Sequence, residues 1–358
     1  MTLEEAAAEI RELDAVRPRG GGTKLGWSPA GEAAVDFDTR RLNRILEHNE
    51  GDFTAVLEAG VPLVEAQAQF GRAGQMLALD PPLGAGDAAT IGGIIAANDA
   101  GPLRHHFGSM RDLVVGVTVV LSDGTIAKSG GQVIKNVAGY DLGKLFAGSF
   151  GTLGLIARVA VRLHPAPERT ATAVAESDDP AALGAAALKL AALPLEADAL
   201  DVDWEGDRGR LAIRFGGTTA GDRAHAAAQH IEIGDVRIAE DDHELWAQQR
   251  ARQRMTDGVV VKVAGRPTDL PAVIGAARDA GATVVSRAAL GISYVAGADV
   301  AAVRAALAPR SCTVLDGADR VQDPWPAVDP GALKVMERIK ARFDPARRFR
   351  PGAFVGGL

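Results

Sequence analysis

A dense set of glycines among apolar residues, between positions 131 and 154, constrains the fold of this chain more than any other feature. The glycines of this stretch are Gly131, Gly139, Gly143, Gly148, Gly151 and Gly154. Glycine weakens regular structure, so this density predicts backbone that lies close to something large and flat. The alternating segment that follows, Leu155–Leu163, predicts a half-buried strand.

A second glycine cluster stands near the N-terminus. Gly20, Gly21 and Gly22 lie between Arg19 and Lys24, after an amphipathic helix expected at 3–15. Consecutive glycines let backbone N–H groups converge on a phosphate, and the two basic residues add positive charge beside it. Taken alone, a flexible connector explains the cluster equally well, because glycine runs mark loops in any protein.

A third segment, 80–98, is dominated by small residues from Gly84 to Ala97. A bulky planar ligand could lie against its main chain. The pattern Gly84-Ala85-Gly86-Asp87-Ala88-Ala89 matches the G-x-G-x-x-G/A fingerprint of dinucleotide-binding folds, which must leave a strand directly. Pro81 and Pro82 come just before it and fit poorly in a parallel strand, so we reject the Rossmann interpretation.

Composition limits the class of protein. The 358 residues suit about two domains, and a net charge of −7 without a basic tail argues against nucleic acid as a partner. The single cysteine, Cys312, excludes an internal disulfide and an iron–sulfur cluster held by this chain alone. No apolar run reaches the roughly 18 residues that span a bilayer and no signal-peptide pattern is evident, so we expect a cytoplasmic protein.

Four segments together resemble the vanillyl-alcohol oxidase / p-cresol methylhydroxylase family of flavoproteins. They are the Arg-Pro-Arg-Gly-Gly-Gly-Thr-Lys loop at 17–24, the Thr-x-Gly-Gly-x-x-Ala-x-Asn pattern at 90–98, the stretch 135–154 and the tail Phe343–Gly352. The tail carries Arg350 where the family pattern has asparagine. The resemblance covers roughly residues 15–165 and 333–352.

The resemblance implies an α+β fold: a p-cresol methylhydroxylase (PCMH)-type FAD-binding domain with two subdomains, and an antiparallel-sheet, ferredoxin-like cap domain. The predicted boundaries are 1–168 for the FAD-binding domain, 169–325 for the cap and 326–358 for a tail returning to the first domain. The cap prediction agrees with the strand–helix–strand–strand–helix–strand rhythm between Val259 and Leu315.

The resemblance also implies FAD as the cofactor. Covalent attachment is not expected, because Thr23 follows the glycines where tethered relatives carry a histidine. The expected FAD-binding residues are Arg19, Gly20, Gly21, Gly22, Thr23, Lys24, Pro82, Leu83, Gly84, Thr90, Gly92, Gly93, Ala96, Asn98, Lys135, Asn136, Tyr140, Asp141, Gly151, Thr152, Leu153 and Ile156.

Within the family, the chain resembles the small flavin subunits of bacterial complexes that oxidise glycolate or related 2-hydroxy acids. This implies a larger flavin subunit and an iron–sulfur subunit as partners, with peripheral placement at the inner membrane only through them. The His-x-Gly-Asp-Gly-Asn motif of the larger subunit is missing here, so no metal ligands are predicted. A scaffold subunit that leaves substrate turnover to its partner stays open as the alternative.

The candidate catalytic residue is Arg250, because arginine's planar fork suits a substrate carboxylate. The segment 245–250 resembles a Leu-Trp-x-x-Arg pattern of the family cap with one extra residue. A solvated helix face is the competing interpretation, since Arg252 and Arg254 lie close by. His105 and His106 are a second candidate for a base, against an ordinary surface position for the pair.

Overall fold

The computed structural model describes residues 1–131 and 141–358, which form two compact units. Unit 1 comprises residues 1–100, 108–166 and 327–358, and unit 2 comprises 101–107 and 167–326. The division at 168/169 and 325/326 stays a prediction; by its contacts, the short segment 101–107 belongs to unit 2. Each unit has its own hydrophobic core.

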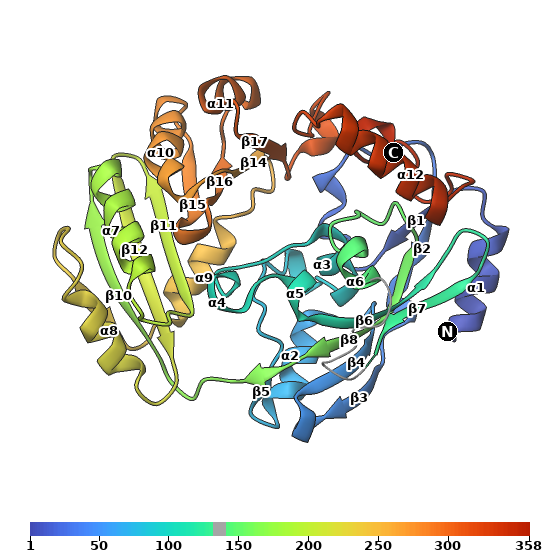
Figure 1. Ribbon diagram of the computed structural model, residues 1–358, viewed down its shortest axis with the longest axis horizontal. Coiled ribbons are helices and arrows are strands. Elements are labelled where there is room, and N and C mark those ends of the chain that lie inside the picture. Colours follow the sequence, from blue (N-terminus) through green and yellow to red (C-terminus); the bar gives the residue numbers. More distant parts are fainter. Residues whose placement is uncertain (132–140) are drawn as a thin grey trace. The chain divides into compact units, whose positions relative to one another are not determined.

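Unit 1 combines a five-stranded antiparallel sheet with a parallel strand pair and several short helices (Figure 1). The five-stranded sheet has the order β3-β4-β8-β6-β7, and β1 pairs with β2 in parallel. The strands of unit 1 are β1 (Val16–Arg19), β2 (Val35–Asp38), β3 (Ile45–Asn49), β4 (Thr54–Glu58), β5 (Gln75–Met76), β6 (Val114–Val120), β7 (Ile126–Gly130), β8 (Leu155–Arg162) and β9 (His164–Pro165). Its helices are α1 (Leu3–Glu12), α2 (Leu63–Gly71), α3 (Ile91–Ala97), α5 (Met110–Leu113), α6 (Leu142–Phe146) and α12 (Pro330–Phe343).

Local sequence explains how unit 1 begins. Thr2 and Glu5 form a capping box at the start of α1, which satisfies two backbone N–H groups that the first helical turn leaves open. The apolar face of α1 is buried in a small core with Val16 and Phe349. Strands β6 and β7 form a hairpin, paired in antiparallel register.

The tail of unit 1 is held by a buried lysine. The ammonium of Lys340 on α12 donates to the carbonyl oxygens of Thr152 (2.7 Å) and Phe349 (2.9 Å) and to the carboxylate of Asp344 (2.7 Å). Phe349 also forms a parallel β-bridge with Val16, the first residue of β1. All three donors of the ammonium are therefore used, and the tail is attached both to β1 and to the loop at 150–154.

Unit 2 consists of two ferredoxin-like halves joined into one eight-stranded antiparallel sheet. The order β13-β10-β12-β11-β15-β16-β14-β17 places each half in the spatial order 4-1-3-2, and β11 pairs with β15 across the junction. The strands are β10 (Thr170–Ser177), β11 (Ala199–Glu205), β12 (Arg208–Gly216), β13 (Arg237–Ala239), β14 (Val260–Ala264), β15 (Thr283–Arg287), β16 (Ile292–Ala296) and β17 (Ser311–Val314). The helices are α4 (Arg104–Phe107), α7 (Pro180–Ala192), α8 (Ala220–Ala228), α9 (His243–Ala251), α10 (Leu270–Asp279) and α11 (Val300–Leu307).

The sheet of unit 2 has an apolar face and a polar face. Helices α7, α8, α10 and α11 contribute to the large core on one face, and α7 and α10 contact each other (Figure 1). Along β11, Leu200, Val202 and Trp204 enter this core, while Asp201 and Asp203 alternate onto the other face. Helix α9 covers part of that other face, where its Trp246 is buried.

The α+β fold expected from the sequence is confirmed, including the antiparallel, ferredoxin-like unit. No helix in the ranges 1–131 and 141–358 is long and apolar enough to cross a membrane.

Candidate cofactor site

The main depression of unit 1 lies where the glycine loop after β1, the start of α3, the start of β8 and the tail meet. Its empty volume is about 700 Å³ including the part open to solvent, a size suited to an organic cofactor. It is lined by Pro18, Arg19, Gly20, Gly21, Gly22, Thr23, Lys24, Leu25, Thr39, Ala59, Thr90, Gly92, Gly93, Ala96, Ala97, Phe150, Gly151, Gly154, Leu155, Ile156 and Arg350.

The glycine loop is packed tightly against the segment before α3. A Cβ atom at Gly20 would lie 2.1 Å from the hydroxyl oxygen of Thr90, and one at Gly21 would lie 1.8 Å from the carbonyl oxygen of Ala88. Gly22 adopts a left-handed conformation with φ of +72°. The glycines are therefore required by the packing of two loops, a reason that the sequence argument, based on access of a phosphate, did not contain.

The glycine loop lines the depression and also has backbone donors available to a ligand. Within the described residues, the N–H groups of Gly21 and Gly22 donate no hydrogen bond to the protein. Thr90 caps α3, since its hydroxyl accepts from the N–H of Gly93 (3.4 Å). Unbonded N–H groups beside a glycine loop form a site for an anion such as a diphosphate.

The two basic residues beside the glycine loop already have acidic partners. Arg19 donates to Asp36 (2.9 Å), and the ammonium of Lys24 lies 3.2 Å from the carboxylate of Asp99. Hydrogen bonds from Arg17 and Arg19 hold the pKa of Asp36 below its usual value, so this carboxylate is ionised. The charge of Arg19 and Lys24 is thus compensated within unit 1.

Arg350 differs from these residues. It is buried in the wall of the depression, and its guanidinium donates to the carbonyl of Phe150 (2.9 Å) and to the hydroxyl of Ser28 (2.7 Å). Burial, and then the nearby charge of Arg17, lower its pKa to about 10, which still leaves it charged at neutral pH. The sequence analysis recorded Arg350 only as a departure from the family tail.

The structure brings together many of the residues expected to bind FAD. Those that line the depression are Arg19, Gly20, Gly21, Gly22, Thr23, Lys24, Thr90, Gly92, Gly93, Ala96, Gly151 and Ile156. Others lie behind it: a Cβ atom at Gly84 would be 2.6 Å from the Thr23 side chain, and Leu153 is buried in the main core of unit 1. Pro82, Leu83, Asn98, Asp141 and Thr152 are also outside the lining. Lys135, Asn136 and Tyr140 lie outside the described residues.

Several lining residues were missed by the sequence analysis, including Thr39, Ala59, Phe150 and Gly154. Phe150 has a φ of +54°, and the sequence carries no signal for this conformation. Gly154 belongs to the glycine stretch that opened the sequence analysis but was not carried into the list of FAD-binding residues.

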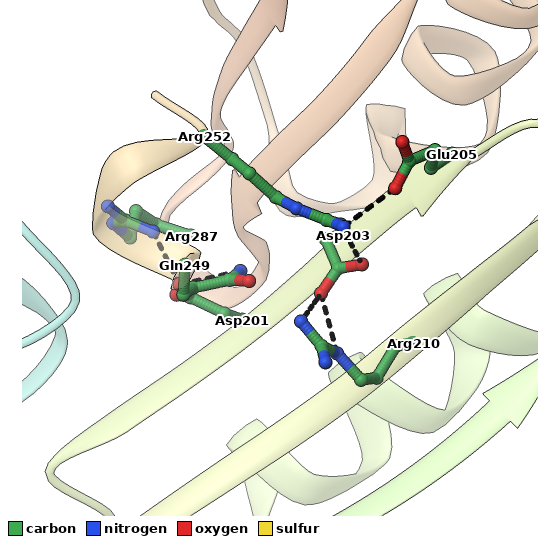
Figure 2. Close-up of polar contacts among 7 residues, drawn as sticks. All are labelled: Asp201, Asp203, Glu205, Arg210, Gln249, Arg252 and Arg287. Atoms are coloured by element: carbon green, nitrogen blue, oxygen red, sulfur yellow. Dashed lines mark hydrogen bonds and ion pairs between the residues drawn. The ribbon is translucent and has the colours of Figure 1, made fainter. Parts of the chain in front are cut away.

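The polar face of unit 2 carries a chain of ion pairs (Figure 2). Asp203 accepts from Arg210 (2.8 Å) and from Arg252 (3.2 Å), which in turn donates to Glu205 (2.6 Å). Burial raises the pKa of Asp203, although Arg210 acts in the opposite direction. Asp201 pairs with the buried Arg287 and accepts from Gln249 (3.1 Å) on α9.

The catalytic candidates of the sequence analysis lie in unit 2. Arg250 is half-buried on α9, next to the Gln249 that holds Asp201. His105 and His106 lie on α4; burial, and then the neighbouring His106, lower the pKa of His105. Cys312 is buried in the unit 2 core, and burial raises the pKa of its thiol.

Comparison with known proteins defines the class of unit 1. Residues 2–130 match the profile of a family described as an FAD binding domain. Together with the glycine-lined depression, this makes the protein a flavoprotein whose cofactor is FAD.

The relatives specify this class further. The chain is 35% identical over 167 residues to glycolate oxidase subunit GlcE of Escherichia coli, covering 46% of this chain and 47% of that protein. It is 39% identical over 168 residues to glycolate oxidase subunit GlcD of Bacillus subtilis, covering 46% and 35%. The chain is thus homologous to glycolate oxidase subunits, and its resemblance to FAD-binding PCMH-type flavoproteins is confirmed. The matched region spans less than half the length of these relatives.

The fold has a solved counterpart. An alkyldihydroxyacetonephosphate synthase superimposes with a TM-score of 0.72 over 97% of this chain and 75% of that one, at 15% sequence identity. At this identity the likeness shows a shared fold alone.

Proposed function

We propose that the chain is an FAD-dependent dehydrogenase subunit that oxidises a 2-hydroxy acid, glycolate to glyoxylate being the leading case. The observation that carries the proposal is the glycine-lined depression of unit 1, in a chain homologous to glycolate oxidase subunits. In this reaction the substrate loses a hydride from the carbon and a proton from its hydroxyl group, two electrons in all. Bound FAD supplies the hydride acceptor.

We assign different parts of the cofactor to different segments of unit 1. Gly21 and Gly22, whose N–H groups donate no hydrogen bond within the described residues, are offered to the diphosphate, and the small residues Gly92, Gly93 and Ala96 leave main chain open to a flat ring system. We propose non-covalent binding. It is supported by Thr23 after the glycines and by the burial of Cys312 inside the unit 2 core.

Arg250 is our candidate for the substrate carboxylate. Its neighbour Gln249 is fixed by Asp201, which holds α9 against the polar face of the sheet. Replacing Arg250 with methionine should raise the KM for glycolate about 10- to 100-fold, the loss expected for a charge-assisted hydrogen bond. The matched control is Arg278→Met, an exposed arginine on α10. Equal KM values for the two variants would remove Arg250 from the site.

The same proposal includes partners. The chain has one cysteine, so an iron–sulfur cluster that accepts electrons needs ligands from another chain. The two relatives are subunits of glycolate oxidases, which supports a multi-subunit complex, and we propose a larger flavin subunit and an iron–sulfur subunit as its other members. We propose a cytoplasmic complex that reaches the inner membrane through these partners. The second candidate function is a scaffold subunit, favoured by the absence of a His-x-Gly-Asp-Gly-Asn motif in the sequence.

One experiment separates the candidates. The chain is purified alone, its visible absorption is recorded, and glycolate or D-lactate is added without oxygen. Bleaching of the flavin band supports a subunit with its own substrate site. A flavin band that stays oxidised rejects turnover by this chain alone and leaves electron relay. Folded protein without flavin supports the scaffold function.

A further inference from the structure

We propose that Arg350 is a cofactor-binding residue whose guanidinium supplies the positive charge for the diphosphate of FAD. The proposal rests on FAD binding by unit 1 and does not depend on which substrate is oxidised. Neither the sequence motifs nor the family profile, which ends at residue 130, assigns a role to this position.

Burial is the first support. Arg350 is 7% exposed, and its Nε atom is buried without a hydrogen-bond partner in the described structure. Its two protein partners, the Phe150 carbonyl and the Ser28 hydroxyl, are both neutral. A buried cation that keeps its charge needs compensation, because desolvation costs several kcal/mol per ion.

The second support is the contrast with the other cations of the loop region. Arg19 and Lys24 have carboxylate partners in Asp36 and Asp99, whereas Arg350 has no ion pair among the residues that the structure describes. Arg17 also donates to Asp36. Among these cations, Arg350 is therefore the one whose charge the described protein leaves for an anion to neutralise.

Position is the third support and identifies the anion. The N–H of Arg350 donates to the carbonyl of Val16 (3.0 Å), so the residue lies beside β1, which leads directly into the glycine loop. A Cβ atom at Gly151 would be 3.7 Å from the Arg350 side chain and 3.8 Å from Pro18. The guanidinium thus lines the same depression as the unbonded N–H groups of Gly21 and Gly22, where a diphosphate fits.

The backbone of Arg350 supports a specific role for its side chain. The residue has a φ of +43°, a left-handed conformation that is unfavourable for a residue with a Cβ atom. The N–H bond to Val16 and the two side-chain bonds fix this conformation. The guanidinium is therefore held in place before the cofactor arrives, which reduces the entropic cost of binding.

The test is to titrate cofactor-free protein with FAD, with ADP and with riboflavin, and to measure each affinity by isothermal titration calorimetry. Arg350→Met should weaken FAD and ADP about 10- to 100-fold and leave riboflavin unchanged, because only the first two ligands carry a diphosphate. Arg350→Lys should give a smaller loss. The control is Arg342→Met, an exposed arginine of α12, which should bind all three ligands like the parent.

Two outcomes would overturn the assignment. Parent-like affinity for FAD in the Arg350→Met protein means that the guanidinium does not contact the cofactor. Loss of riboflavin affinity with ADP affinity intact moves the contact to the flavin end. If Arg350→Met does not fold, Arg350→Gln replaces it, since glutamine retains an amide donor for Phe150 and Ser28 but carries no charge.

A purely structural role is tested separately with Ser28→Ala. This change removes one hydrogen bond of the guanidinium and keeps its charge, so FAD affinity should stay within about threefold of the parent. A loss as large as that of Arg350→Met would show that Arg350 acts by bracing the loop, and would reject the proposal. The rise in Tm that FAD gives should shrink in Arg350→Met and persist in Ser28→Ala.

Discussion

The depression of unit 1 and the polar face of unit 2 use buried charge in opposite ways. On the unit 2 sheet, Asp203 and Asp242 are each held by at least one arginine, so the charges neutralise one another within the protein. In the unit 1 depression, Arg350 lacks a carboxylate partner in the described chain and the N–H groups of Gly21 and Gly22 are unbonded. The paired charges of unit 2 stabilise its fold. The uncompensated charge in the depression of unit 1 favours the binding of an anionic ligand.

The largest effect is expected at Asp242. This buried carboxylate accepts from Thr170 (2.8 Å), Thr172 (2.8 Å) and Arg214 (3.1 Å). Asp242→Ala leaves Arg214 without its partner and should lower the free energy of unfolding of unit 2 by about 3–5 kcal/mol. Urea unfolding measures this loss.

The comparison is sharpened by two further measurements on the same protein. The exposed neighbour Asp241 provides the control, and Asp241→Ala should change stability by less than about 0.5 kcal/mol. FAD affinity should be retained in Asp242→Ala, because its partners all lie in unit 2. If Asp242→Ala lowers FAD affinity under conditions where the protein is still folded, the charges that stabilise unit 2 and those that bind the cofactor are not separate.

An intermediate effect is expected at Gly21. A methyl group there meets the Ala88 carbonyl, so Gly21→Ala forces the glycine loop away from the segment before α3. Overpacking of this kind costs about 1–3 kcal/mol, and FAD affinity should fall by at least tenfold as the N–H groups move. The flavin absorbance of the purified protein gives its FAD content, and a fluorescence titration measures the loss of FAD affinity.

The matched control is Gly71→Ala at the end of α2, where a Cβ atom has no neighbour within 4 Å. That variant should retain full flavin content. Full flavin content in Gly21→Ala as well would contradict the assignment of this loop to the diphosphate.

The smallest effect is expected at Asp269, a partly exposed carboxylate of unit 2. Hydrogen bonds from Arg310 and from the N–H of Arg266 lower its pKa to about 2. Because the folded pKa lies below the unfolded value of about 3.9, the contribution is complete above pH 4 and is lost as pH falls towards 2. Asp269→Asn should cost less than about 1 kcal/mol at pH 6.

Urea titrations at pH 6 and pH 2.5 check this sign. The difference between Asp269→Asn and the parent should be measurable at the higher pH and largely absent at the lower one. The control is the exposed Asp279, replaced by asparagine and measured at the same two pH values. A difference that grows on acidification would reverse the argument.

Much of the fold could be predicted because its strands alternate clearly. Along β11, Leu200, Val202 and Trp204 enter the core between polar neighbours, an alternation that is visible in the sequence. Strand β10 and helix α7 were not anticipated. The segment 170–192 is so rich in alanine that neither the two-residue apolar repeat of a strand nor the 3.6-residue repeat of a helix stands out. Without these two elements the duplication within unit 2 could not be recognised from the sequence.

The candidate site was predictable where glycine carries the signal. The segments 20–24 and 92–93 line the depression as the motifs suggested, and their role with FAD stays a prediction. Arg350 could not be placed from the sequence, since it reaches the depression only through the return of the tail to β1. The neutralisation of Lys24 by Asp99 likewise depends on a contact between distant residues.

The return of residues 327–358 to unit 1 has a consequence for synthesis on the ribosome. Unit 2 takes almost all of its chain from the continuous stretch 167–326, so it can be completed while the tail is still inside the exit tunnel. Phe349 and Arg350, which bridge Val16 and line the depression, emerge more than 300 residues after the glycine loop. The part of the depression wall that Arg350 forms is therefore missing throughout the translation of unit 2.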